Sequence, residues 1–376
     1  MMEMTGRRIV VKLGTKILTD GGPHLSVRVM TDLVRQIAAL VEAGAEVAIV
    51  TSGAVAAGRA RVGTPDGDSD VTQRQVLAAI GQSHLVERYD SLFQPHGLIA
   101  AQALLTRADL ADRGGYLNAR NTIAGLLAIP KVVPLINEND VVADEELRGG
   151  AFGENDGLSA LVANLIDADL LMLLSDVAGL YETDPGASPD APPLAEISDL
   201  DAALRFAGPA AADTPHGGRG GMRAKVEAAR LASSAGCNVV VAHGLEEDAL
   251  LRIARGERLG TLFPARGSRP ESRKRWLLSG LASAGAIIVD TGAARALRQQ
   301  GRSLLSAGIT EADGDFQRGD IVEVRDDRGK RIAVGISAYG SAEIQQIQGR
   351  RSEEISSILG YELGEEVIHR NNMAVL

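Results

Sequence analysis

A lysine and a glycine turn follow the first strongly apolar stretch of the chain. Residues 9–11 are all β-branched and predict a buried strand that ends in Lys12-Leu13-Gly14-Thr15. Such a strand end can aim one cation, Lys12, and the backbone N–H groups of the turn at an anionic group such as a phosphate. On these residues alone, a solvated lysine at a strand end is the simpler interpretation.

A second cation follows the most glycine-dense stretch, residues 217–225. Glycines such as Gly220 and Gly221 let backbone N–H groups approach a phosphate, and the start of a helix favours negative charge. Lys225 is predicted on the first turn of that helix, where its side chain can reach the same anion. The stretch does not match GxxxxGK[ST], so the sequence excludes a P-loop nucleotide-binding fold.

Polar residues also follow three other predicted strands, over residues 45–50, 131–136 and 169–174. Ligands of open α/β sheets bind at the carboxyl ends of strands. The predicted site region therefore includes Ser52-Gly53-Ala54, the run Asn137-Glu138-Asn139-Asp140, and Ser175-Asp176. A helix N-cap at the first run and an Asx turn at the second are the alternatives. Asn155 or Asp156 is expected to cap a helix over residues 157–166.

Strands and helices alternate along the first two thirds of the chain. Helical apolar spacing predicts helices over 31–43, 71–93, 117–128 and 246–255, and apolar runs predict further strands over 97–105 and 238–242. This alternation predicts an α/β fold with an open, mainly parallel sheet sandwiched by helices. From residue 285 the strands are short and glycines are frequent, which predicts a small β-barrel-like domain. We expect domains at 1–260 and 285–363, a linker at 261–284 and a tail at 364–376.

Composition limits the classes of function. The chain has 376 residues and a net charge of −10, which argues against a general binder of nucleic acid or anionic membranes. Its one cysteine, Cys237, follows an Ala-Gly pair and is expected to be buried and structural. The six histidines show no metal-ligand spacing. With no apolar signal segment or membrane span, a cytoplasmic location is expected.

Together, the motifs resemble those of the glutamate 5-kinases, a branch of the amino-acid kinase family that carries a C-terminal PUA domain. The resemblance covers almost the whole chain and rests on the runs 11–15, 50–54, 117–120, 136–140, 155–160, Gly220-Gly221-Met222-x-x-Lys225 and 273–276. It implies transfer of the γ-phosphoryl group of ATP to the side-chain carboxylate of L-glutamate, the first step of proline biosynthesis. The attacking carboxylate is already ionised at neutral pH, so this reaction needs no general base.

The resemblance also implies roles by position. Lys12 and Lys225 would stabilise the transferring phosphoryl group, and Asp156 would orient both lysines. Glutamate would be held by Ser52, Gly53, Ala54, Asp140 and Asn155. ATP would be surrounded by Lys12, Gly14, Thr15, Ser175, Asp176, Arg219, Gly220, Gly221, Met222, Arg223, Ala224 and Lys225. The resemblance also implies Mg²⁺ as a cofactor that accompanies ATP, with no metal-binding residues assigned. The chain departs from the family pattern at Lys16, Glu154, Arg219 and Ala224.

The family also implies dimers or tetramers and competition by proline at the glutamate site. An alternative hypothesis is an RNA-binding protein that retains a degenerate kinase fold, because PUA domains elsewhere bind structured RNA. Residues 284–363 contain ten Lys and Arg against twelve Asp and Glu, whereas an RNA-binding surface is normally basic. A structural or regulatory role is therefore favoured for this domain. The basic run 273–276 is likewise read as a solvated linker rather than an RNA contact.

Overall fold

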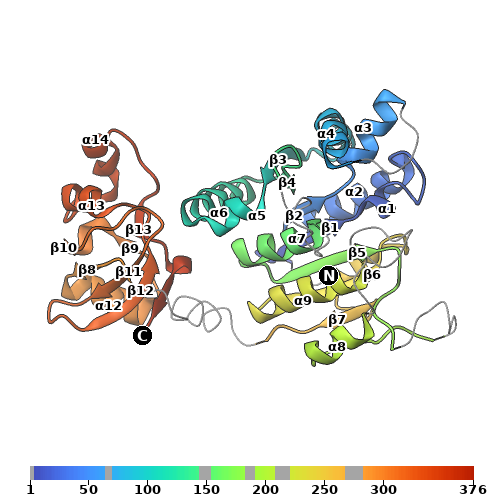
Figure 1. Ribbon diagram of the computed structural model, residues 1–376. Helices are drawn as coiled ribbons and strands as arrows, with labels where there is room; N and C mark the ends of the chain where they lie inside the picture. Colours follow the sequence, from blue (N-terminus) through green and yellow to red (C-terminus); the bar gives the residue numbers. More distant parts are fainter. Residues whose placement is uncertain (1–3, 64–69, 144–153, 183–190, 208–220, 267–282) are drawn as a thin grey trace. The chain divides into compact units, whose positions relative to one another are not determined.

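The computed structural model describes residues 4–63, 70–143, 154–182, 191–207, 221–266 and 283–376 (Figure 1). The chain divides into two compact units, Met1–Leu110 with Ala119–Arg266, and Ala111–Asn118 with Gly267–Leu376. Among the helices of the described ranges, none combines the length and apolar character that a bilayer crossing requires.

The first unit is built on a seven-stranded sheet in the order β3-β4-β2-β1-β5-β6-β7. Neighbouring strands are parallel except β7, which runs antiparallel to β6. The predicted open, mainly parallel sheet is confirmed. Its strands are β1 (Arg8–Leu13), β2 (Glu46–Thr51), β3 (Ile99–Leu105), β4 (Val132–Glu138), β5 (Leu170–Ser175), β6 (Asn238–His243) and β7 (Thr261–Phe263).

Helices cover both faces of this sheet. The helices that occur between β1 and β7 along the chain are α1 (Thr15–Leu18), α2 (Val27–Glu42), α3 (Ala54–Val62), α4 (Val71–Phe93), η1 (Gln94–His96), α5 (Arg107–Ala111), α6 (Arg113–Ala128), α7 (Glu154–Leu165), α8 (Leu200–Phe206), α9 (Met222–Ser234) and α10 (Ala249–Ala254). The predicted limits of α4 match, whereas α2 and α6 begin four residues earlier than expected and α10 is shorter.

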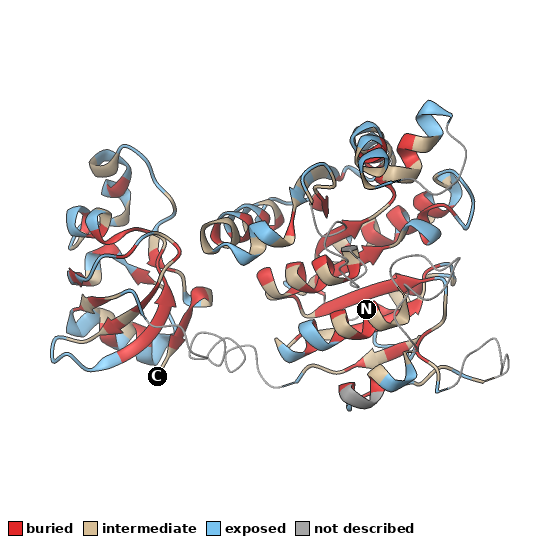
Figure 2. Cartoon of the chain, in the orientation of Figure 1, coloured by how far each residue is buried: buried red, intermediate tan, exposed pale blue. Residues whose placement is uncertain are grey.

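The side chains of β1 point alternately to the two faces of the sheet, and this determines which helices each of them contacts. Ile9, Val11 and Leu13 lie in one core with α2, α4 and α10. Because successive side chains of a strand point to opposite faces, Lys12 points to the other face. On that face α7 packs against β1 and β5, and α9 packs against α7 and β6. Figure 2 shows these central strands as buried.

Helices α3 and α4 approach so closely that glycine is required at their contact. A Cβ atom on Gly81 would overlap the carbonyl oxygen of Ala54. We expect Gly81→Ala to lower the free energy of unfolding by about 1–3 kcal/mol, since neither backbone can yield. Gly125→Ala is the matched control, because Gly125 is an exposed residue of α6 with nothing within 4 Å of the added atom. Urea denaturation should show that control unchanged or stabilised by up to about 1 kcal/mol.

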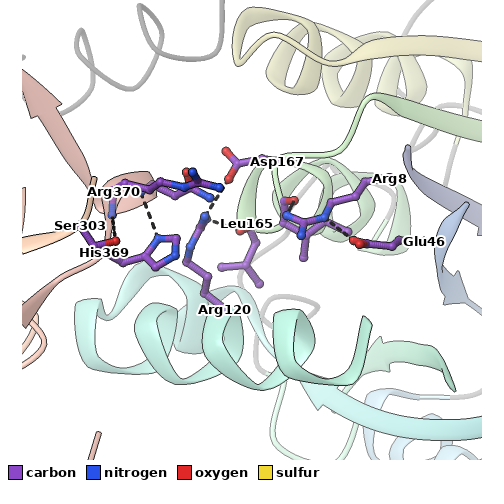
Figure 3. A network of polar contacts seen from close by, with 10 residues as sticks. Arg8, Glu46, Arg120, Leu165, Asp167, Ser303, His369 and Arg370 are labelled. Atoms are coloured by element: carbon purple, nitrogen blue, oxygen red, sulfur yellow. Dashed lines mark hydrogen bonds and ion pairs between the residues drawn. The ribbon is translucent and has the colours of Figure 1, made fainter. Parts of the chain in front are cut away.

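Two arginines hold the carboxyl end of α7 (Figure 3). Arg120 donates to the carbonyl of Leu165 and pairs with Asp167 at 2.7 Å, and Arg8 donates to the carbonyl of Ile166 at 2.9 Å. The last carbonyls of a helix lack helical partners and attract positive charge. These contacts fix α7, whose first turn carries Asn155 and Asp156. Arg120, which belongs to the run 117–120, thus helps to hold in place the helix that carries Asn155 and Asp156.

The second unit contains the small, mainly β domain that the sequence predicted. One sheet has the order β10-β8-β11-β12-β14, and β13 pairs with β9. Its core includes the buried side chains of Phe316 and Tyr339. Residues predicted as a tail form β13 and β14. The elements are β8 (Gly285–Val289), α12 (Thr291–Gln300), β9 (Leu304–Leu305), η4 (Ser306–Gly308), β10 (Ile309–Asp313), β11 (Ile321–Arg325), β12 (Arg331–Ile336), α13 (Ser341–Ile347), η5 (Ser352–Glu354), α14 (Ile355–Leu359), β13 (Glu366–Ile368), η6 (Arg370–Asn372) and β14 (Met373–Val375).

Candidate active site

Three charged side chains from separate elements meet in the first unit. Lys12 comes from β1, Asp156 from the first turn of α7 and Lys225 from the first turn of α9. The Nζ atom of Lys12 lies 2.6 Å from Oδ1 of Asp156, and the Nζ atom of Lys225 lies 3.2 Å from Oδ2. The carboxylate is 0% exposed and each lysine side chain 8%. The structure therefore places one carboxylate between two buried ammonium groups.

The electrostatics of this cluster favour an anionic ligand. Burial on its own would raise the pKa of the Asp156 carboxyl, but Lys12 and Lys225 outweigh it and hold the pKa below its usual value. Burial lowers the pKa of the Lys225 ammonium, with a smaller contribution from Lys12, and Asp156 opposes this shift. Two cations against one anion leave an excess positive charge in a region of low dielectric, where a phosphoryl group would be strongly attracted.

A chain of amides lies beside the cluster. Asn155 donates from Nδ2 to Ser52 Oγ at 2.8 Å and to Asn137 Oδ1 at 3.1 Å, and Asn137 donates to Gln82 at 2.8 Å. Oδ1 of Asn155 is buried and accepts no hydrogen bond from the described part of the chain. This oxygen is an acceptor that a bound ligand can use.

Two expectations about this region were wrong. Asn155 and Asp156 do not cap a helix over 157–166, because α7 begins at Glu154 and both residues belong to its first turn. Strand β4 does not end at Ile136 but continues through Asn137 and Glu138, which are buried. The ladder to β3 extends to Glu138, so backbone pairing overrides the turn preference of these polar residues. Asp140 follows in a turn and is half-buried.

The turn after β2 depends on glycine. Gly53, rather than Ser52, is the N-cap of α3, and its φ is 105°, a conformation that other residues rarely adopt. The Ser52 N–H donates to the carbonyl of Leu13 at 2.9 Å, so this turn is joined to the end of β1. Ala54, the first residue of α3, is buried. Ser52, Gly53 and Ala54 thus follow the carboxyl end of β2, as predicted, and this turn lies beside the end of β1.

Those of the residues assigned to ATP that the structure describes lie at the ends of β1 and β5 and at the start of α9. Gly14 caps α1, and a Cβ atom there would lie 3.4 Å from Nζ of Lys12; Thr15 is exposed. Ser175 is buried and donates to Asp176 at 3.2 Å. Gly221 is the N-cap of α9, followed by the half-buried Met222 and Arg223 and the buried Ala224. Arg219, Gly220 and the basic run 273–276 lie outside the described residues.

The family departure at Lys16 forms an ion pair that sequence reasoning missed. Lys16 Nζ lies 3.0 Å from Asp176 Oδ2, with both side chains about half exposed. Burial would raise the pKa of the Asp176 carboxyl, but Lys16 lowers it below its ordinary value. Asn137 was also missed as an individual site residue, although its place after an apolar run was a signal. The predicted burial of Cys237 is confirmed.

Comparisons with known proteins find two family models that match the chain. The amino acid kinase family model matches residues 7–243, and the PUA domain model matches residues 285–359. A protein named glutamate 5-kinase from Dehalococcoides mccartyi (strain CBDB1) is 49% identical over 376 residues, covering 100% of both chains. Proteins of the same name from Herpetosiphon aurantiacus and Shewanella halifaxensis are 49% and 46% identical, over 97% and 100% of both chains respectively.

Proposed function

This chain belongs to the glutamate 5-kinase branch of the amino acid kinase family, and we propose that it transfers the γ-phosphoryl group of ATP to the side-chain carboxylate of L-glutamate. The product is L-glutamyl 5-phosphate, an acyl phosphate and the first intermediate of proline biosynthesis. The single observation that carries the proposal is the buried cluster of Lys12, Asp156 and Lys225. No second function is favoured by a specific observation.

In the proposed mechanism the lysines act by charge. The glutamate carboxylate is ionised, so attack on the γ-phosphorus requires no proton transfer, and the barrier lies in bringing two anions together. Lys12 and Lys225 would neutralise the oxygens of the migrating phosphoryl group. Asp156 would hold both ammonium groups in place before the substrates bind, so that little reorganisation accompanies the reaction.

Glutamate would bind against the amide chain. Ser52 and Asn155 are already joined by a hydrogen bond of 2.8 Å, and the buried Oδ1 of Asn155 offers an acceptor for a substrate N–H group. Asp140 would pair with the α-ammonium, since a carboxylate is its natural counter-charge. The turn at Gly53 and Ala54 would offer backbone N–H donors to an anionic group.

ATP would bind near Gly14, Thr15, Ser175 and Asp176 and the start of α9, with residues 221–225 around it. Magnesium fits this site only as an ion brought by the nucleotide. Within the described residues no group of three or more His, Cys, Asp or Glu could hold a metal, and both oxygens of Asp156 face lysines. Mg²⁺ is commonly held by phosphates, waters and one or two carboxylates, and Asp176 would supply the carboxylate here. It would add positive charge to the β- and γ-phosphates.

Three further properties stay predictions of the family resemblance. They are competition by proline at the glutamate site, assembly into dimers or tetramers, and a cytoplasmic location. RNA is not proposed as a partner, because the second domain carries no excess of positive charge.

The reaction itself is tested with hydroxylamine. Purified protein, ATP, Mg²⁺ and L-glutamate should yield a hydroxamate, because hydroxylamine traps acyl phosphates. Acetylglutamate, aspartate and carbamate serve as competing acceptors in parallel reactions. A hydroxamate from acetylglutamate or aspartate, with none from glutamate, would reject the proposed substrate but keep the reaction class.

Activity should fall at alkaline pH earlier than a free lysine would require. The pKa of Lys225 lies below the ordinary 10.5, so raising the pH removes its proton, and with it a phosphoryl-stabilising charge, below that value. The pKa of the free enzyme is read from kcat/KM, and in Lys225→Arg the guanidinium stays charged, so the alkaline fall in kcat/KM should move to higher pH. Lys330→Arg, an exposed change in the second unit, should leave the profile in place. A wild-type kcat/KM that holds constant up to pH 10.5 would contradict this assignment.

A further inference from the structure

Next to the turn that follows β2 and carries Ser52 and Gly53, the hydroxyl of a buried tyrosine contacts the last residue of β2. Tyr89 lies on α4 and is 0% exposed, and its hydroxyl is 2.9 Å from Oγ1 of Thr51. The Thr51 hydroxyl lies 3.0 Å from the carbonyl oxygen of Ser52, to which it donates. A chain of hydrogen bonds, which we call the relay, therefore links the Tyr89 hydroxyl, the Thr51 hydroxyl and the Ser52 carbonyl. It leads from the core to the turn that carries Ser52 and Gly53.

The donors and acceptors in this chain of hydrogen bonds follow from the chemistry of its groups. A carbonyl oxygen accepts only, so the single proton of the Thr51 hydroxyl is used on Ser52, and Thr51 Oγ1 must accept from Tyr89. Burial raises the pKa of the Tyr89 hydroxyl, which keeps its proton in place at neutral pH. The relay thus runs from the Tyr89 O–H through the Thr51 O–H to the Ser52 C=O.

The relay controls a donor of the substrate site. In a trans peptide the C=O group and the following N–H group point to opposite sides, so holding the Ser52 carbonyl also fixes the Gly53 N–H. Other contacts position the rest of Ser52: its N–H donates to Leu13 at 2.9 Å, and its Oγ accepts from Asn155 at 2.8 Å. Gly53, at φ 105°, has a freer backbone than any other residue would have, so its peptide needs such a restraint.

We propose that Tyr89 is a positioning residue that acts through Thr51 to hold the Ser52–Gly53 peptide in the orientation that binds glutamate. It does not touch the substrate. This inference rests on the proposed function, because it assigns that peptide to the glutamate site.

The test measures KM for each substrate in variants that break the relay at different points. Tyr89→Phe and Thr51→Val each remove one hydroxyl with little change of shape. Each should raise KM for glutamate by about threefold to tenfold, the value of one hydrogen bond, and leave KM for ATP within twofold. The double variant should match the single ones, because either change breaks the same relay. Thr51→Ser keeps the hydroxyl and should retain the wild-type KM.

Tyr339→Phe is the matched control for loss of a buried tyrosine hydroxyl. The Tyr339 hydroxyl donates to the carbonyl of Gly364 at 2.7 Å in the second unit, far along the chain from the turn. This variant should lose thermal stability much as Tyr89→Phe does, with KM for glutamate unchanged.

The outcomes separate the relay from the proposed function. Wild-type protein that forms hydroxamate, with Tyr89→Phe and Thr51→Val at wild-type KM for glutamate, would overturn the relay alone. Additive effects in the double variant would also overturn it. Wild-type protein that forms no hydroxamate from glutamate would overturn the proposed function, and the relay with it.

Discussion

Lys225→Ala is expected to lower kcat by at least about tenfold, a loss of 1.4 kcal/mol or more of transition-state stabilisation. In the wild type, two ammonium groups face one carboxylate, which leaves a positive charge for the phosphoryl group. Without Lys225 the pair of Lys12 and Asp156 is neutral, and that attraction is lost. Because charge develops during transfer, the loss should appear in kcat more than in KM for either substrate.

The experiment compares Lys225→Ala with a change of charge on the same helix. Steady-state assays at saturating ATP and glutamate would give kcat for both variants, with circular dichroism to confirm that each is folded. Arg230→Ala removes an exposed cation from α9 and should change kcat less than twofold. Unchanged turnover in Lys225→Ala would remove this lysine from the mechanism.

The strands and helices of the first unit could be predicted because the sequence patterns that indicate them are local. Apolar runs and helical spacing lie within windows of ten to twenty residues, and the alternation of strand and helix dictates a parallel sheet. The strand ends at Lys12, Ser52 and Ser175 were found the same way. That β7 joins antiparallel at the edge was not predicted, since a strand of three residues carries little pattern.

The meeting of Lys12, Asp156 and Lys225 was expected from the family resemblance, not from spacing. Lys225 lies 69 residues from Asp156 along the chain, and no local pattern encodes such a contact. Asn155 or Asp156 was expected to cap a helix, because both residue types favour caps. Instead they lie inside α7, where tertiary contacts with Ser52 and the two lysines outweigh that preference.

The supports of the site could not be predicted at all. A tyrosine at position 89 fits the apolar face of a long helix, and only the packing of α4 against β2 brings its hydroxyl to Thr51. Likewise, Arg8 and Arg120 are 112 positions apart, yet both donate to carbonyls at the end of α7. Such contacts depend on the pairing of elements in three dimensions, which a single sequence does not specify.

Asp156→Asn is expected to destabilise the protein by about 3–5 kcal/mol at pH 7, because it leaves two buried ammonium groups without their counter-charge. Inorganic phosphate should recover part of this loss, since an anion bound between Lys12 and Lys225 restores the missing charge. Urea denaturation at increasing phosphate concentration would measure both effects. Asp176→Asn is the control: its pair with Lys16 is about half exposed, so its loss should cost less than about 1 kcal/mol.

The pH dependence of stability should show why Asp156→Asn destabilises the protein. The pKa of Asp156 is lowered in the folded protein, so its contribution to stability is present above the ordinary carboxyl value of 3.8 and disappears as pH falls through the lower, folded value. The difference in stability between wild type and Asp156→Asn should therefore be full at pH 7 and shrink below pH 3.8. A difference that stays constant on acidification would mean that the loss comes from packing, and that Asp156 does not hold the two lysines by its charge.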